Sequence, residues 1–240
     1  MTELLYHADS YLKEFFAEVI KVLPEQNAIL LDRTAFFPGG GGQVFDKGQI
    51  MVKDTQAGLK RAKSSLIGIL HILEDGQPLP GVGTQVTGIL DWDRRYKVMR
   101  THTAMHILCG VIFRDYGALV TGGDMEPLKG RMDFEFESMT KDLVESIEVA
   151  VNKEVQEKRS VCIEVLPREE AFKIPDLIRT KINLLPDHIK EVRTVEIVGL
   201  DLQADGGTHV RTTQEVGRIH VVDYKSKGKI NKRIYINLEP

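Results

Sequence analysis

The sequence has few features that would hold the chain together covalently or anchor it in a membrane. It contains only two cysteines, Cys109 and Cys162, which excludes a disulfide framework and favours a reducing compartment. Its longest apolar run extends only over residues 107–113, far short of the ~20 residues that a membrane-spanning helix needs. The first residues carry acids and no uninterrupted apolar core, unlike a secretory signal. We therefore expect a cytoplasmic protein with no membrane partner and no obligate protein partner.

An excess of positive charge is also missing. The formal net charge is −3, and a domain that binds nucleic acid over its whole surface is usually strongly basic. Any contact with a polyanion must therefore come from local patches. Two groups of basic residues qualify: Arg94, Arg95, Lys97 and Arg100, and then Lys225, Lys227, Lys229, Lys232 and Arg233. Charge alone favours solvated faces for both.

The glycine run Gly39–Gly42 lacks the context of a known phosphate loop. No Lys-Ser or Lys-Thr pair follows it, and the chain has no G-x-G-x-x-G fingerprint between a strand and a helix. Two interpretations are left. Gly40 and Gly41 can allow a substrate to approach the backbone closely, or the run is the tip of a flexible hairpin.

The pattern along the chain predicts an α+β protein of two domains. Short apolar runs at 28–32, 66–73 and 85–90 are separated by Gly and Pro turns, which indicates a small β-barrel over residues 1–90. The second domain, 91–240, contains two predicted helices and several predicted strands. The helices run from Asp91 or Asp93 to about Asp115 and over 143–155, and the strands cover 131–136, 161–165, 192–198, 218–224 and 229–238.

The strongest chemical signal is His102-Thr-Ala-Met-His106. Two histidines four residues apart lie on one face of a helix, so both imidazoles can reach one metal ion. The spacing resembles the H-E-x-x-H zinc proteases, but Thr103 stands where their catalytic Glu belongs, which disfavours that chemistry. By itself this pair is also typical of structural histidines.

A second cluster, Asp205-Gly-Gly-Thr-His209, strengthens the metal hypothesis. Gly206 and Gly207 permit a sharp turn that can bring Asp205 and His209 to a common centre, although an ordinary Asp-Gly-Gly turn is the alternative. Cys109 lies two turns from His102, too far for a shared ion, so we expect Cys109 and the strand residue Cys162 to be core. No role is assigned to the four other histidines, His7, His71, His188 and His220.

These motifs, in this order, resemble the editing domain of alanyl-tRNA synthetase and its freestanding relatives, the AlaX trans-editing proteins of the medium-length class. The editing domain of threonyl-tRNA synthetase is a more distant relative. The likeness covers most of the chain and includes the segments Arg33–Gln43, His102–His106, Asp205–His209 and Lys229–Ile234. It implies a small β-barrel followed by an α+β editing core.

The resemblance implies hydrolysis of the ester between an amino acid and the 3′ end of tRNA. The expected substrate is tRNA for alanine wrongly charged with serine, with glycine as the alternative amino acid. The family pattern places one zinc ion per chain on the positions of His102, His106, Asp205 and His209. The synthetase pattern has Cys where this chain has Asp205, and we therefore expect one of three outcomes: an ion held by harder ligands, weaker metal binding, or coordination by the three histidines and a water.

We assign further roles as expectations. Backbone N–H groups of Gly206 and Gly207 could stabilise an oxyanion. Thr34 and Gln43, with Thr103 as a lesser candidate, carry groups that can hydrogen-bond a serine hydroxyl and so reject alanine. The two basic groups then become candidate tRNA contacts. The competing functions are another zinc-dependent hydrolase of small esters or amides and a non-catalytic tRNA-binding module.

Overall fold

The structure is a computed structural model that describes residues 2–53, 55–180 and 189–240. His188 lies outside the described residues. The chain forms two compact units, Met1–Lys97 and Val98–Pro240. Among the described residues, no helix is both long enough and apolar enough to cross a membrane.

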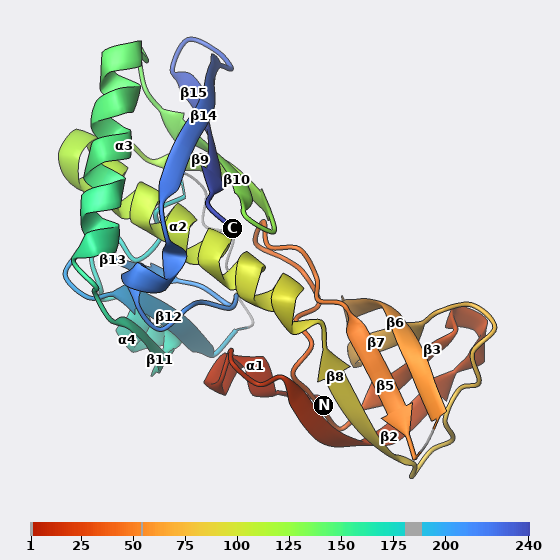
Figure 1. The fold of residues 1–240 in the computed structure, drawn as a ribbon. Helices are drawn as coiled ribbons and strands as arrows, with labels where there is room; N and C mark the ends of the chain where they lie inside the picture. Colours follow the sequence, from red (N-terminus) through yellow and green to blue (C-terminus); the bar gives the residue numbers. More distant parts are fainter. Residues whose placement is uncertain (1, 54, 181–188) are drawn as a thin grey trace. The chain divides into compact units, whose positions relative to one another are not determined.

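The first unit is built on a closed six-stranded barrel in the order β2-β3-β7-β6-β5-β8 (Figure 1). The predicted small barrel is therefore confirmed. Its interior is filled by aliphatic and aromatic side chains such as Leu31, Phe36 and Ile50, each fully buried and each stabilising the fold by roughly 1.5–3 kcal/mol. The elements of this unit are β1 (Glu3–Leu4), α1 (Leu5–Ala8), β2 (Glu14–Leu23), the short 3₁₀ helix η1 (Pro24–Gln26), β3 (Ala28–Leu31), β4 (Arg33–Thr34), β5 (Gly48–Val52), β6 (Thr55–Ser65), β7 (Gly68–Leu73) and β8 (Gln85–Leu90).

The long helix α2 (Trp92–Tyr116) begins in the first unit. Asp91 caps it by accepting a hydrogen bond from the backbone N–H of Arg94 at 3.1 Å, as the sequence predicted. In this first turn Arg95 is fully buried and pairs with Asp46, and it donates to the carbonyl oxygens of Ser10 and Ala35. These bonds explain why the first turn belongs with the barrel, so that the division falls inside the helix. The boundary predicted at residue 90 lies just before it.

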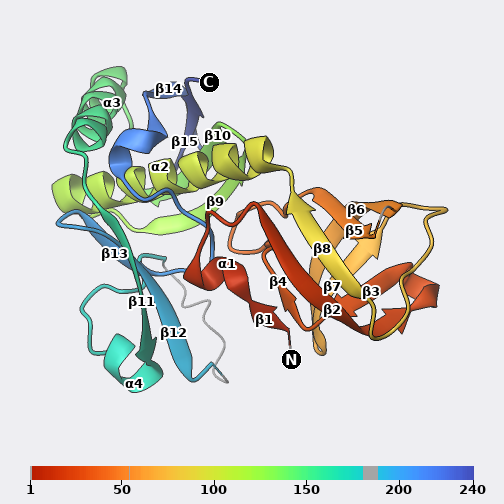
Figure 2. The same cartoon turned by 60° about the horizontal axis from the view of Figure 1, so that its bottom comes forward.

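The second unit contains two antiparallel sheets, and α2 packs against both (Figure 2). Met105 lies against Gly123 and Gly130 of the first sheet, and Gly110 lies against Asp201 of the second. The first sheet has the order β14-β15-β10-β9 and the second β11-β12-β13. The elements are β9 (Val120–Glu126), β10 (Lys129–Glu135), α3 (Lys141–Gln156), β11 (Val161–Pro167), α4 (Arg168–Ala171), β12 (Glu191–Ile197), β13 (Asp201–Ala204), the 3₁₀ helix η2 (Thr213–Val216), β14 (Ile219–Ser226) and β15 (Asn231–Leu238).

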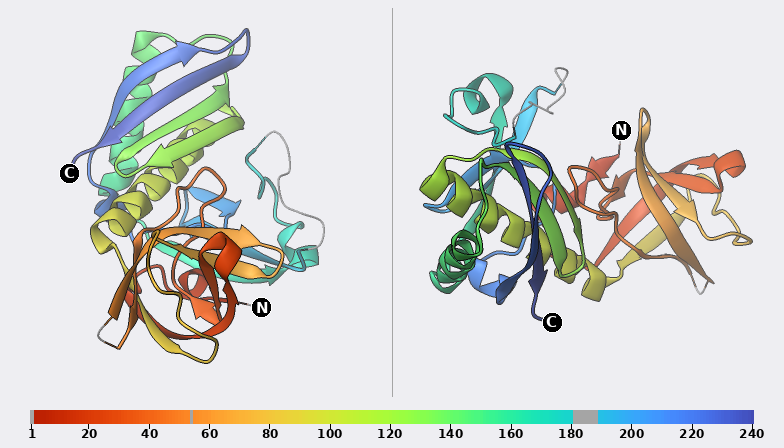
Figure 3. Two further views of the ribbon diagram at one scale, coloured as in Figure 1. Left: turned by 90° about the vertical axis from the view of Figure 1, so that its right-hand side faces the viewer. Right: turned by 90° about the horizontal axis from the view of Figure 1, so that it is seen from above.

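Helix α3 lies across one face of the four-stranded sheet (Figure 3). Its buried residues include Ile147, Val151 and Val155, at the four-residue spacing that predicted the helix. Thr140 caps its first turn by accepting a hydrogen bond from the N–H of Leu143 at 3.3 Å. Asn152 ties α3 to β14, because its amide bonds both the N–H and the carbonyl oxygen of Ile219.

Candidate metal centre

Helix α2 carries both histidines of the first motif. Residues 101–112 are buried on all sides, so these imidazoles lie inside the second unit rather than on its surface. The rings of His102 and His106 are 5.1 Å apart between centroids. Their four-residue spacing therefore places them on one helix face, as predicted.

Strand β13 and the loop after it supply the other side of the centre. Side chains alternate along a strand, so Asp201, Gln203 and Asp205 point toward α2, while Leu202 and Ala204 pack on the opposite side. Gly110 makes this approach possible. A Cβ there would lie 2.9 Å from Asp201 Cβ and would push the strand away from the helix.

The two motifs converge as the sequence predicted. One ligand atom from each of His102, His106, Asp205 and His209 lies within 4.8 Å of all the others. Asp205 joins the two histidines nearest to it: its Oδ1 is 3.5 Å from His102 Nε2, and its Oδ2 is 3.0 Å from His209 Nε2. The rings of His102 and His209 are stacked at 4.1 Å. The four side chains could hold one metal ion.

Burial sets the protonation of these groups. It lowers the pKa of His209 to about 4 and the pKa of His102 well below its usual value. Burial also opposes ionisation of Asp205, but the neighbouring histidines outweigh it and hold the pKa of that carboxyl well below its usual range. Neutral imidazoles and an ionised carboxylate are the forms that bind a metal cation.

Two buried side chains orient the histidines from outside the cluster. Asp201 Oδ2 lies 3.0 Å from His106 Nδ1, and this hydrogen bond raises the pKa of His106 although burial opposes it. Thr103 Oγ1 lies 3.1 Å from His209 Nδ1 and also accepts from the N–H of Val210. When Nδ1 of each imidazole donates outward in this way, its Nε2 lone pair is free to face a metal.

The donor set fits zinc. Three imidazoles and a carboxylate are borderline-to-hard ligands that zinc accepts, and a tetrahedron with bonds of ~2.0–2.1 Å has ligand atoms about 3.4 Å apart. In this structure His102 Nε2 lies 3.5 Å from Oδ1 of Asp205 and His209 Nε2 lies 3.0 Å from Oδ2, while one ligand atom of each of the four residues lies within 4.8 Å of the others. Cys109 is buried on the same helix and lies outside the cluster, as expected. Cys162, expected in the core, is instead exposed because β11 is an edge strand with one face in solvent.

The turn between Asp205 and His209 forms differently from the prediction. Neither Gly206 nor Gly207 has a positive φ. The Asp205 side chain closes the turn by accepting a hydrogen bond from the Gly207 N–H at 2.7 Å. This N–H is therefore not free for an oxyanion in the present structure, while the role of Gly206 stays a prediction.

Within the barrel unit, the residues predicted to contact substrate already form hydrogen bonds with other protein groups. Thr34 is fully buried, lies 2.8 Å from His71 Nε2 through its hydroxyl and accepts from the Phe36 N–H. Gln43 is buried where the glycine loop closes, and its backbone pairs with Gly40. Thr103, the lesser candidate, is engaged with His209. A contact of Thr34 or Gln43 with substrate stays a prediction.

The candidate tRNA contacts fall into three kinds. Arg95 and Lys232 are buried, Arg95 on Asp46 and Lys232 on the carbonyl oxygens of Gly228 and Lys229, so both side chains have a structural role instead. Others are engaged at the surface: Arg94 with the Phe45 carbonyl, Lys97 with Asp93, Arg100 with the Val216 carbonyl, Lys225 with Asp223 and Arg233 with Asp133. Lys227 and Lys229 are exposed and form no ion pair with another described residue.

Sequence analysis missed Asp201, Gln203 and His71. For the first two a signal was present in the sequence, because they precede Asp205 at two-residue steps, the period of one strand face, although no strand was predicted there. Gln203 donates to Asp201 Oδ2 at 2.7 Å and so helps to fix it. His71 carries no local signal, since its partner Thr34 is far away in the sequence.

Comparison with known proteins finds two matching families and full-length relatives. Residues 192–235 match the family described as the threonyl and alanyl tRNA synthetase second additional domain, and residues 8–94 match the class II (A) tRNA synthetases. The chain is 42% identical to the alanyl-tRNA editing protein AlaX-M of Saccharolobus solfataricus, with 100% of both chains covered, and 38% identical to that of Methanosarcina acetivorans, with 99% of both covered.

A longer relative shares the same region. The alanine–tRNA ligase of Ignicoccus hospitalis is 36% identical over 92% of this chain, which corresponds to 24% of the ligase. The full-length similarity to the AlaX-M proteins shows that this chain belongs to the AlaX-type alanyl-tRNA editing proteins, which are deacylases that hydrolyse mischarged aminoacyl-tRNA.

Proposed function

We propose that this chain hydrolyses the ester of serine wrongly attached to tRNA for alanine, with one zinc ion held by His102, His106, Asp205 and His209. The observation that carries the proposal is the convergence of these side chains, from α2 and from the loop after β13, within 4.8 Å. Membership of the editing family supplies the reaction class.

Zinc bound there would supply a Lewis acid that activates a water or polarises the ester carbonyl. Residues of this chain set the protonation state and the orientation of the ligand side chains. Burial keeps the lone pairs of His102 and His209 unprotonated, and Asp205 stays ionised beside them. Asp201 and Thr103 fix the ring orientations of His106 and His209.

The choice of serine over alanine requires a partner for one hydroxyl. A site that hydrogen-bonds this group can reject the analogue that lacks it by roughly 10⁴–10⁵. Thr34 and Gln43 stay the proposed partners. Lys225, Lys227 and Lys229, exposed around the hairpin of β14 and β15, stay proposed contacts to the tRNA backbone.

The test is release of amino acid from tRNA for alanine charged with serine or with alanine. The full chain should release serine and spare alanine, and His102→Ala should lower turnover by at least about 100-fold, more than loss of an outer partner of a metal ligand. His220→Ala is the matched control, because that histidine is half-buried and pairs with Glu239 away from the cluster. Equal release from both tRNAs would contradict the selection of serine over alanine. Full turnover in folded His102→Ala would remove the cluster as the catalytic centre.

A further inference from the structure

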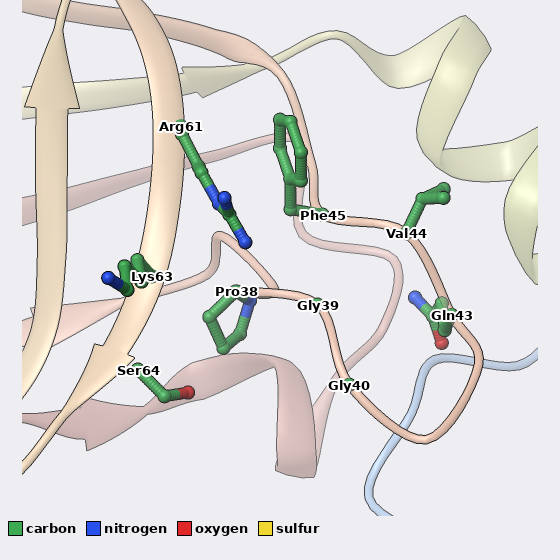
Figure 4. Close-up of a pocket in the computed structure, with 9 residues that line it drawn as sticks. All are labelled: Pro38, Gly39, Gly40, Gln43, Val44, Phe45, Arg61, Lys63 and Ser64. Carbon is green, nitrogen blue, oxygen red and sulfur yellow. The ribbon is translucent and has the colours of Figure 1, made fainter.

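A pocket of about 400 Å³ opens on the barrel unit, between the glycine loop and β6 (Figure 4). One wall is backbone, from Gly39 and Gly40. The other wall is formed by Arg61, Lys63 and Ser64 of β6. The volume is within the ~300–1,000 Å³ of ordinary small-molecule sites.

A β-bulge turns Arg61 toward this pocket. Ala57 and Leu59 of β6 are buried in the barrel, so strict alternation would send Arg61 into the core as well. The register against β7 shifts between Leu59 and Arg61, after which Ala62 is the buried residue. Arg61 and Lys63 therefore both face outward, and bulges commonly re-aim a side chain in this way next to functional sites.

No acidic side chain that the structure describes neutralises the two cations on this wall. Neither Arg61 nor Lys63 forms an ion pair with another residue that the structure describes. The Arg61 guanidinium lies 5.2 Å from the centroid of the Phe45 ring, which restrains it over an aromatic face. Arg61, Lys63 and Ser64 all line this wall, and a guanidinium, an ammonium and a hydroxyl are donors that phosphate oxygens accept.

On the wall opposite Arg61, the glycine loop presents backbone and no side chains to the pocket. Gly39, Gly40, Gly41 and Gly42 all have positive φ, and the loop is closed by the backbone pair Gly40 and Gln43. A Cβ on Gly40, which lines the pocket, would meet no atom of the described residues within 4 Å. A ligand can therefore contact the backbone directly on this side.

We propose that this pocket binds a nucleotide of tRNA, with its phosphate on Arg61 and Lys63 and its sugar against the glycine wall. The proposal rests on the tRNA substrate of the proposed function and assigns a phosphate site that this substrate uses. Phosphate contacts of this kind position RNA without reading its sequence.

The test measures binding of an uncharged transcript of tRNA for alanine to the full chain at several salt concentrations. Arg61→Ala/Lys63→Ala should weaken binding about tenfold and reduce the slope of log affinity against log salt by about 0.7, since one phosphate contact to a single strand is lost. The matched control is Lys21→Ala/Lys60→Ala. It changes the net charge equally at exposed positions of the same barrel, and Lys60 pairs with Asp75. The single variant Lys63→Glu, followed by fluorescence of Trp92 to confirm folding, repeats the test with one side chain.

The outcomes separate this proposal from the proposed function. If the wild-type chain releases serine from tRNA and the double variant binds tRNA like the control, the phosphate site is wrong and the deacylase is not. If the wild-type chain neither binds nor deacylates tRNA, the proposed function fails first. Titration with AMP distinguishes the source of the phosphate. Competition by AMP only at millimolar concentration supports tRNA, and competition at stoichiometric AMP would identify a free-nucleotide site instead.

Discussion

Asp201 is the residue that gives the candidate metal centre its fixed geometry. Its side chain is fully buried, accepts from Gln203 at 2.7 Å and lies 3.0 Å from His106 Nδ1. Arg179, stacked on Phe113 at 3.7 Å from the ring centroid, places its Nε 3.5 Å from the second oxygen of Asp201. The carboxylate is thus held on both sides, and it holds the imidazole in turn.

Replacing Asp201 should therefore weaken metal binding without removing a ligand. For Asp201→Asn we expect zinc affinity to fall roughly 10–100-fold, because outer partners of metal-binding histidines contribute that much. Competition with a chelator of known affinity measures it directly.

Asp223→Asn is the control for this measurement, since Asp223 pairs with Lys225 on the exposed hairpin. Equal zinc affinities of the Asp201 variant, the Asp223 variant and the unmodified chain would contradict the positioning role.

His71 links the stability of the barrel unit to pH. Burial lowers its pKa to about 4 from an ordinary value of 6.5, so the unfolded chain binds the proton more tightly than the folded one. Its contribution to stability is complete above about pH 6.5 and is lost as pH falls toward 4.

Between pH 7.5 and pH 5 this histidine should lower the free energy of unfolding by about 2 kcal/mol. His71→Gln, which cannot titrate, should lack that part of the decrease. Denaturant unfolding followed by fluorescence of Trp92, the single tryptophan, measures both proteins. Identical pH dependence in the two would show that His71 is not the titrating group.

At the residue scale, the sequence predicted only contacts between residues that are close together along the chain. The pair His102 and His106 follows from helix periodicity, and Asp205 with His209 from one short loop. The contacts of Thr34 with His71 and of Asp201 with His106 join residues that are distant along the chain. No spacing rule reaches across such a separation, so these contacts became visible only in the fold.

At the scale of secondary-structure elements, one buried ion pair joins the first turn of α2 to the barrel. Arg95 bonds Asp46 through more than one nitrogen and also bonds the carbonyl oxygens of Ser10 and Ala35. Asp46 in turn accepts from the Phe37 N–H at 2.7 Å. The pair therefore joins the helix to both ends of the glycine loop.

Arg95→Leu should destabilise the barrel unit by about 3–5 kcal/mol, because it leaves the Asp46 carboxylate buried without its partner. Denaturant unfolding with Trp92 fluorescence measures the change.

Arg33→Leu serves as the comparison. Arg33 pairs with Asp32 and Glu3 at the surface, where such pairs contribute about 0–1 kcal/mol. If the Arg95 variant were no less stable than the Arg33 variant, the stabilising role of the Arg95–Asp46 pair would be wrong.

Element prediction succeeded where one face was clearly apolar. Both long helices and the strands β3, β7, β8, β10, β11, β12, β14 and β15 were predicted. Strand β2 was missed because the exposed residue next to the buried Phe15 is another phenylalanine, Phe16, 73% exposed, so the apolar–polar alternation does not show in the sequence. Strand β6 was missed because its bulge interrupts the period at Arg61.

For the whole molecule, composition excluded a uniformly basic RNA-binding surface, and the structure locates the basic groups that could serve instead. Arg61 and Lys63 lie on the barrel unit, and Lys227 and Lys229 on the hairpin of the second unit. The two family matches also fall in different units: one covers residues 8–94 of the first unit and the other residues 192–235 of the second. The sequence motifs predicted the family, whereas charge alone predicted a solvated face at Lys227 and Lys229 and did not single out Arg61 or Lys63.

The central claim is that the cluster of three histidines and Asp205 hydrolyses the seryl ester with a bound metal. Serine release from tRNA for alanine, measured before metal removal, after removal with a chelator and after addition of one equivalent of zinc, tests it most directly. We predict that activity is lost with the metal and returns with zinc. Unchanged serine release by a protein shown to be free of metal would contradict the account.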